Sequence, residues 1–125
     1  MINKEEVLLI HTEVVKIHGG ANGLRDEGGL ESAIVRPFQT FGGEDLYPTV
    51  FEKAAAIGES IIMNHPFIDG NKRTGYVLME TILRIEGLCI NASDEDLYSF
   101  VIKVSTGEIR FKEIKDWLKK NTSPL

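Results

Sequence analysis

The sequence has almost no cysteine and no long apolar run. Cys89 is the only cysteine among 125 residues, so no intramolecular disulfide can form, and we expect a reducing, cytoplasmic setting. No apolar run approaches the ~20 residues that a transmembrane helix needs, so we expect no membrane contact. The first segment contains Lys4, Glu5 and Glu6 among its apolar residues, which is not the pattern of a secretory signal peptide.

Positive charge is also scarce. Lys and Arg number 14 against 19 Asp and Glu, and the net charge is −5. A general nucleic-acid binder is normally basic, so we expect no direct contact with nucleic acid. An acidic chain is still compatible with a basic partner or a local positive pocket. The length predicts one domain with its own core, over residues 1–125.

Capping and stop signals divide the chain into about six helices, and no segment is predicted to be a strand. We expect helices over residues 4–18, 30–36, 50–64, 72–86, 94–104 and 111–120. The third and fourth are apolar nearly all round, which is typical of a buried central pair. The predicted fold is a compact all-α bundle.

The first helix shows the expected periodicity. Four apolar residues recur at helical spacing and are expected to face the core: Val7, Ile10, Val14 and Ile17. His11 and His18 are seven residues apart and therefore lie on roughly one face of this helix. No cysteine or acidic residue at ligand spacing supports a metal site, so we expect ordinary surface or part-buried histidines.

The most informative stretch joins the two central helices. It is His65–Arg73 and reads His-Pro-Phe-Ile-Asp-Gly-Asn-Lys-Arg. The histidine precedes a proline and therefore ends the first helix, and the aspartate–glycine pair forms a turn. Asn71 is then the expected N-cap of the second helix, which places Lys72 and Arg73 in its first turn.

Two cations in the first turn of a helix are electrostatically unfavourable. The helix N-terminus carries roughly half a positive charge, and a cation there costs on the order of 0.3–1 kcal/mol. A bound anion reverses this effect, because free backbone N–H groups, Lys72 and Arg73 converge on it. We therefore expect Asn71, Lys72 and Arg73 to bind phosphate groups. Gly70 leaves space for a phosphate to approach the backbone closely.

The rest of the loop supplies the other groups that phosphate chemistry needs. Asp69 is a hard oxygen ligand for the Mg²⁺ that a bound phosphate would carry. His65 is the residue type best suited to take a proton near neutral pH. Together these groups predict a phosphoryl- or nucleotidyl-transfer site. The alternative, a helical corner with a capping histidine and two solvated cations, leaves the cation pair unexplained.

These nine residues resemble the signature of the Fic/Doc superfamily, and specifically of its Doc (death-on-curing) toxin branch. The Fic branch has glycine at the position of Lys72 and a second arginine at the position of Tyr76, and both departures match the Doc pattern. The resemblance covers almost the whole chain, including Gly23–Asp26, Gly29–Ala33 and Thr106–Ile109. It implies a Fic/Doc-like all-α fold.

The resemblance also implies a function. A Doc-type toxin would transfer the γ-phosphate of ATP to a threonine of elongation factor Tu and thereby arrest protein synthesis. His65 would be the base, Asp69 would hold Mg²⁺, and Gly70–Arg73 would bind ATP. A flap at Phe38–Tyr47, beside the active site, would hold the target by main-chain pairing. A Phd-type antitoxin, with a disordered C-terminal segment that folds into a groove on the toxin, would be the partner.

Two other functions stay open. Fic relatives transfer AMP, and glycine at the position of Lys72 leaves them room for the nucleotide; the lysine and the missing second arginine favour a kinase. A catalytically silent interaction module is the other alternative, but loss of His65 or Asp69 would be its sign, and both are present. Many Fic proteins carry an inhibitory helix with Ser or Thr four residues before Glu. Ile82 stands four residues before Glu86, so inhibition is expected from another chain.

Overall fold

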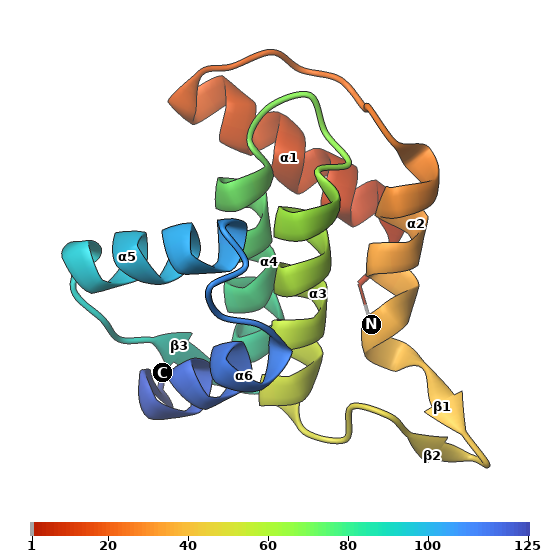
Figure 1. Ribbon diagram of the computed structural model, residues 1–125, viewed down its shortest axis with the longest axis vertical. Helices are drawn as coiled ribbons and strands as arrows, with labels where there is room; N and C mark the ends of the chain where they lie inside the picture. The colour runs from red at the N-terminus through yellow and green to blue at the C-terminus, as the bar shows by residue number, and fades with distance from the viewer. Residues whose placement is uncertain (1) are drawn as a thin grey trace.

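The two helices that flank the motif form the centre of the molecule. The computed structural model describes residues 2–125, and in that range α3 (Val50–Asn64) lies beside α4 (Asn71–Ile85), with the other helices packed around the pair (Figure 1). The surrounding elements are α1 (Lys4–His18), α2 (Glu27–Val35), the 3-10 turn η1 (Arg36–Phe38), α5 (Asp94–Ser105) and α6 (Phe111–Lys120). The predicted all-α bundle of about six helices is confirmed.

Glycines allow α3 and α4 to approach closely. A Cβ atom at Gly58 of α3 would lie 2.4 Å from Sδ of Met79, and one at Gly75 of α4 would lie 2.6 Å from Cγ1 of Ile62. Neither position accepts a side chain unless its neighbour moves, so the two helices are fixed at short range. The loop of residues 65–70 between them inherits this fixed geometry.

The core surrounds this helix pair. It consists of large apolar side chains contributed by all six helices and by the motif: Val7, Leu30, Ile57, Ile61, Leu78, Leu83, Phe67, Phe100, Ile114 and Leu118. Burying one such side chain stabilises the fold by roughly 1.5–3 kcal/mol. Phe67 holds the motif loop against this core. Across residues 2–125, no helix has both the length and the apolar character needed to cross a membrane.

Helix α1 has the predicted bounds but a different buried face. Asn3 and Glu6 form a capping box at its start. Ile17, however, is 70% exposed, so its predicted place in the core is wrong. The buried residues of α1 are Val7, His11 and Val14. This stripe has i, i+4, i+7 spacing and includes a histidine, which a search for apolar residues passes over.

Helix α2 begins at Glu27, three residues before the predicted start at Leu30. Its N-cap is Asp26, whose carboxylate accepts a hydrogen bond from the N–H of Gly29 at 2.9 Å. A side-chain cap of this kind stabilises a helix by about 1 kcal/mol, which offsets the low helix propensity of the glycines in the first turn.

The prediction that no segment is a strand is wrong. Two antiparallel pairs occur in the described residues, β1 (Thr40–Phe41) with β2 (Glu44–Asp45) and β3 (Leu88–Ile90) with β4 (Thr122–Pro124). In the second pair Cys89 lies opposite Ser123. Strands of two or three residues are too short to show an alternating pattern, and β3 meets β4 only because the helices bring the two segments together.

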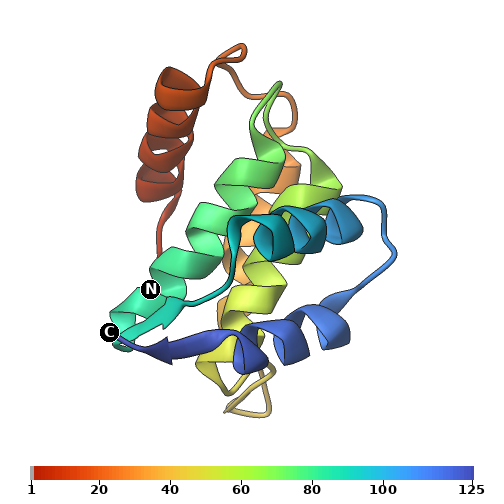
Figure 2. The same cartoon turned by 90° about the vertical axis from the view of Figure 1, so that its left-hand side faces the viewer.

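The β1–β2 hairpin occupies the segment predicted to be the flap, Phe38–Tyr47, but not the predicted place. It lies at the start of α3, whereas the motif loop follows the end of α3, and both views place them at opposite ends of the molecule (Figures 1 and 2). Helix α3 has 15 residues, so at 1.5 Å per residue it separates them by about 22 Å. The expectation of a flap beside the motif at this segment is therefore wrong.

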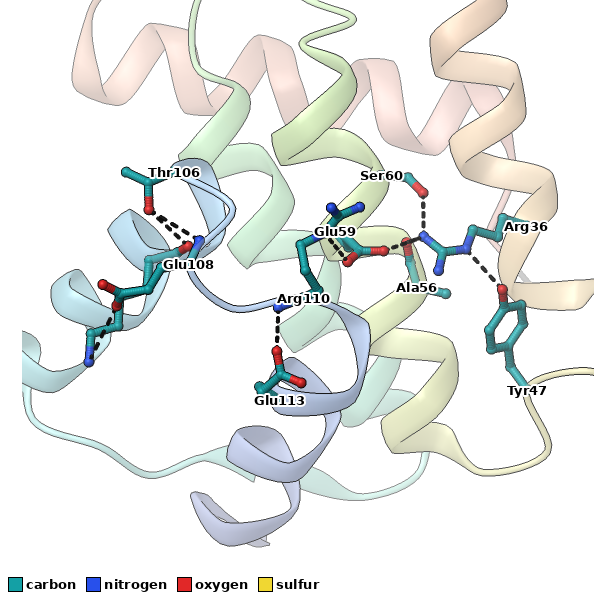
Figure 3. Close-up of polar contacts among 10 residues, drawn as sticks. Arg36, Tyr47, Ala56, Glu59, Ser60, Thr106, Glu108, Arg110 and Glu113 are labelled. Atoms are coloured by element: carbon teal, nitrogen blue, oxygen red, sulfur yellow. Dashed lines mark hydrogen bonds and ion pairs between the residues drawn. The ribbon is translucent and has the colours of Figure 1, made fainter.

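The buried carboxylate of Glu59 connects three elements: α3, η1 and the segment that precedes α6. Glu59 of α3, 7% exposed at its side chain, accepts hydrogen bonds from Nη1 of Arg36 at 2.9 Å and Nε of Arg110 at 3.0 Å (Figure 3). Arg36 also donates to the hydroxyl of Tyr47 at 3.0 Å. Burial alone would raise the pKa of the Glu59 carboxyl, but the hydrogen bonds and charges of the two arginines outweigh burial and lower that pKa.

Replacing Glu59 by glutamine should lower the free energy of unfolding by about 2 kcal/mol at neutral pH, because two hydrogen bonds lose their charged acceptor. The folded-state pKa of Glu59 lies below its ordinary value of 4.5. The carboxylate therefore contributes its stability above that pH and loses it as the pH falls further. Urea titrations should show that the wild-type chain loses stability more steeply below pH 5 than Glu59→Gln does. Glu44→Gln, at an exposed glutamate, serves as control; parallel pH curves for all three proteins would contradict the assignment.

Candidate active site

The motif loop begins with a left-handed residue. His65 follows the last turn of α3 with φ 49° and ψ 56°, and it is the one non-glycine residue with positive φ in the described chain. Such a conformation costs roughly 1–2 kcal/mol. Arg25 offsets this cost, because its guanidinium donates to the carbonyl of His65 and to that of Asn64, both at 2.7 Å. The side chain of His65 itself is exposed.

The segment before α2 runs alongside the motif loop. The N–H groups of Arg25 and Asp26 donate to the carbonyl of Pro66 at 2.7 and 3.0 Å, and the N–H of Ile68 donates to the carbonyl of Gly23 at 3.1 Å. Figure 1 shows this segment arching over the top of the molecule, from α1 to α2. We refer to residues 20–26 as the 20–26 loop. It is the neighbour of the motif, in the place where the flap was expected.

Asp69 also contacts the 20–26 loop. One carboxylate oxygen, Oδ2, accepts a hydrogen bond from the N–H of Ala21 at 2.7 Å, and the side chain remains exposed. A Cβ atom at Gly20 would lie 3.1 Å from Cβ of Asp69, so a larger residue there would crowd the aspartate. Its orientation is thus set by a segment 48 residues away.

His11 supports the loop from the core side. Its ring stacks on Phe67 with centroids 3.7 Å apart and an angle of 6° between the planes, and only 2% of the residue is exposed. Its Nε2 lies 2.8 Å from the carbonyl oxygen of Asp69. Because a carbonyl oxygen only accepts, Nε2 carries a proton and donates it. The sequence predicted an ordinary surface or part-buried histidine, and the structure shows a buried one that fixes the motif loop.

Asn71 closes the loop instead of capping the helix. Its Oδ1 accepts from the N–H of Phe67 and its Nδ2 donates to the carbonyl of Phe67, both at 2.9 Å. Gly70 is the N-cap of α4, with φ 80° and ψ 16°, and Asn71 is the first helical residue. The predicted N-cap role of Asn71 is therefore wrong. Glycine suits the cap because the left-handed conformation is strained for a residue with a side chain.

The first turn of α4 presents unpaired donors. Thr74 is the first residue of this helix whose N–H finds a backbone acceptor, the carbonyl of Gly70 at 2.9 Å. The N–H groups of Asn71, Lys72 and Arg73 have no acceptor within the described chain, as expected for a helix start without a side-chain cap. The side chains of Lys72 and Arg73 are exposed. This turn concentrates positive potential and free donors, the arrangement that binds anions.

A pocket of about 560 Å³ opens beside this turn, between α4 and α5. Its lining comes from the two helices and from the glycine before α4: Gly70, Asn71, Lys72, Arg73, Tyr76, Asp94, Leu97, Tyr98, Val101 and Ile102. This volume is within the range of small-molecule sites. The structure thus brings together all four residues predicted to bind the nucleotide. His65 and Asp69 are not part of the lining and lie in the loop that leads to it.

Tyr76 occupies the wall of the pocket one turn into α4. Its hydroxyl donates to Oε2 of Glu80 at 3.0 Å. Burial, together with the charge and the hydrogen bond of Glu80, raises the pKa of Tyr76 to about 12. The phenol therefore stays neutral and brings no charge to this wall of the pocket.

The donor set at the loop fits a metal ion that arrives with a ligand. Within residues 2–125 no three His, Cys, Asp or Glu side chains gather as a metal cage. Asp69 has a second carboxylate oxygen that accepts no hydrogen bond within the same residues. Mg²⁺ is commonly held by one or two carboxylates, with phosphate oxygens and waters completing its shell. Asp69 stands two residues before the free donors of α4 and supplies the single carboxylate of that pattern.

Replacing His11 by alanine should lower the free energy of unfolding by about 2–3 kcal/mol, because the stacked ring and a buried hydrogen bond are lost together. Urea unfolding measures the change. Glu13→Ala, at an exposed position of the same helix, should change stability by less than about 0.5 kcal/mol. Equal effects of the two substitutions would show that His11 does not support the loop.

Comparison with known proteins identifies the family. Residues 1–83, which contain the whole motif, match the family model of the Fic/DOC family. The chain is 43% identical over 79 residues to "Toxin Doc" of Mycolicibacterium smegmatis, a match that covers 63% of this chain and 60% of that protein. It is 29% identical over 119 residues to "Protein kinase doc" of Escherichia phage P1, covering 95% and 93%. The chain belongs to the Fic/DOC family, in its Doc branch.

Proposed function

We propose that the chain is the toxin of a toxin–antitoxin pair and that it transfers the γ-phosphate of ATP to a protein hydroxyl. The observation that carries this proposal is the first turn of α4, where three free N–H groups, Lys72 and Arg73 meet at the edge of a pocket. The names of the two relatives, a toxin and a protein kinase, agree with it. The proposed acceptor is a threonine of elongation factor Tu, whose modification would arrest protein synthesis.

In this proposal each motif residue has one role. His65 removes the proton from the acceptor hydroxyl, whose oxygen forms a bond to the γ-phosphorus while the bond to the bridging oxygen breaks and ADP leaves. Lys72, Arg73 and the free N–H groups stabilise the charge on the phosphates. Asn71 contributes its main-chain N–H, because its side chain is occupied in closing the loop. Gly70 gives the phosphates access to the backbone.

Asp69 is proposed to hold Mg²⁺ together with phosphate oxygens. When bound, the ion would neutralise phosphate charge, which is its usual contribution to phosphoryl transfer. The hydrogen bond from Ala21 keeps the carboxylate pointing along the 20–26 loop and leaves its other oxygen for the metal.

We place the target beside the 20–26 loop and not at the hairpin. Leu24 of this loop and Ile68 of the motif are exposed apolar side chains. Leu24 pairs with Phe67 in an isolated antiparallel bridge, so the loop already has extended backbone next to the motif. A polypeptide that brings its hydroxyl to His65 would pass along this edge.

We also propose that another chain, a Phd-type antitoxin, neutralises the protein. Support comes from the name of the Mycolicibacterium smegmatis relative, which is a toxin. ATP and a translation factor as substrates place the proposed activity in the cytoplasm. A pull-down of the chain from its native host tests this proposal. If no small protein is recovered with the chain, the result would count against an antitoxin.

The reaction type is tested by incubating the purified chain, Mg²⁺ and a bacterial lysate with ATP labelled at either the α- or the γ-phosphate. Only the γ-label should appear on a protein of the size of elongation factor Tu, and His65→Ala should abolish labelling while its thermal unfolding stays cooperative. Transfer of the α-label would show AMP transfer instead. A folded protein that transfers neither label would favour an interaction module.

Lys72→Ala should lose phosphoryl transfer and yet be slightly more stable than the wild type. A cation in the first turn opposes the helix dipole, so its removal should raise the free energy of unfolding by about 0.3–1 kcal/mol. Lys112→Ala is the matched control, because each lysine is the second residue of its helix, α4 or α6. The control should gain similar stability and keep full activity. Unchanged activity of Lys72→Ala would remove the lysine from the site.

A further inference from the structure

The pocket beside α4 is larger and chemically more varied than phosphate groups require. One end holds Lys72, Arg73 and the free N–H groups, which suit phosphates. The opposite wall belongs to α5, which crosses beside the N-terminal half of α4 (Figures 1 and 2). That wall is mostly apolar and aromatic, and it is formed by Leu97, Tyr98, Val101 and Ile102. A ligand that fills the whole pocket needs an anionic end and a flat or apolar end.

Tyr98 is the aromatic residue that α5 contributes to the pocket lining. It lies in the middle of a helix and 71% of it is exposed, although it borders the pocket. A phenol ring in this position offers a free face on which a planar ring can stack. Aromatic stacking of this kind holds a nucleobase with little regard to its identity.

Asp94 supplies the one carboxylate in the lining. It is the first residue of α5, it is exposed, and it forms no ion pair with any residue of the described chain. A carboxylate next to phosphate groups would repel them, so it is unsuited to the phosphate end of a ligand. It is well suited to accept hydrogen bonds from vicinal hydroxyl groups, as carboxylates do with ribose in nucleotide sites.

We propose that the α5 wall binds the nucleoside of the nucleotide, with the base stacked on Tyr98 and a ribose hydroxyl donating to Asp94. This inference rests on the proposed function, which supplies the nucleotide and the transfer of its γ-phosphate, and it adds the residues that hold the nucleoside. The nucleoside lies at α5, the phosphates run along the first turn of α4, and the terminal phosphate is the one nearest the His65–Asp69 loop outside the pocket. This placement of the nucleoside agrees with the transfer of the γ-phosphate in the proposed function.

Calorimetric titrations with Mg²⁺ present can separate the two ends of the site. ATP and inorganic tripolyphosphate share the phosphates, and only ATP has the nucleoside. The wild-type chain should bind ATP more tightly than tripolyphosphate. Tyr98→Ala should weaken ATP binding by about tenfold, in line with base stacking, and leave tripolyphosphate binding unchanged. Phe41→Ala, at an exposed aromatic residue of β1 outside the pocket lining, should affect neither ligand.

The role of Asp94 is tested with 2′,3′-dideoxy-ATP, which lacks the ribose hydroxyl groups. The wild-type chain should prefer ATP over this analogue by about tenfold or more, the expected effect of a hydrogen bond to a charged group. Asp94→Asn should remove most of that preference. Glu95→Gln, at the exposed acidic neighbour that does not line the pocket, should retain it.

The outcomes distinguish this inference from the proposed function. If Tyr98→Ala and Asp94→Asn bind ATP like the wild type while Lys72→Ala weakens both ATP and tripolyphosphate, the nucleoside lies elsewhere and the inference is overturned, but the proposed function stands. Equal loss of ATP and tripolyphosphate binding in Tyr98→Ala would also overturn the inference. If the wild-type chain binds neither ligand, both the inference and the proposed function fail.

Discussion

The left-handed turn at His65 is the constraint on which the candidate site depends. It ends α3 abruptly and lets the chain return to start α4 only six residues later. The conformation is unfavourable for a histidine, and it persists because surrounding groups hold it. Arg25 takes up the last carbonyl groups of α3, and the glycine contacts between α3 and α4 fix the distance that the loop has to bridge. Strain held in this way is characteristic of functional loops.

Three sets of contacts hold the motif loop in place, and together they leave its reactive groups free. The 20–26 loop binds its outer edge, His11 supports it from the core, and Asn71 closes it across its base. On the motif loop these contacts use main-chain groups, one carboxylate oxygen of Asp69, the ring of Phe67 and the side chain of Asn71. They leave the side chain of His65, one oxygen of Asp69 and the first N–H groups of α4 exposed. The main chain of the loop is therefore held in a fixed geometry, and the groups proposed to contact the ligand remain free to bind it.

Much of this could be predicted from the sequence, since the relevant signals are local. Caps, stops and 3.6-residue periodicity predict the six helices, and the cations in the first turn of α4 indicate an anion site. The missed features depend on partners far apart in the chain: His11 meets Asp69 across 58 positions, and Ala21 meets it across 48. The glycines of the 20–26 loop indicate a turn in the sequence, but they do not indicate which segment packs against that turn.

The placement errors have the same origin. Asparagine is a residue type favoured at N-caps, but the side chain of Asn71 forms hydrogen bonds with Phe67 within the loop, because Gly70 already provides the left-handed cap. The hairpin has the form expected of a flap, but the length of α3 carries it away from the motif. Local chemistry predicts an element, and packing decides what lies next to it.

Amide hydrogen exchange of the nucleotide-free chain tests most directly whether the site is preorganised. We predict protection of the amides of Arg25, Asp26, Phe67 and Ile68, which are hydrogen-bonded across the loop, and fast exchange at Asn71–Arg73. Addition of ATP and Mg²⁺ should then slow exchange at Asn71–Arg73 and change the first group little. Exchange of the first group at the rate of an unfolded chain, with protection only after ATP is added, would contradict the account.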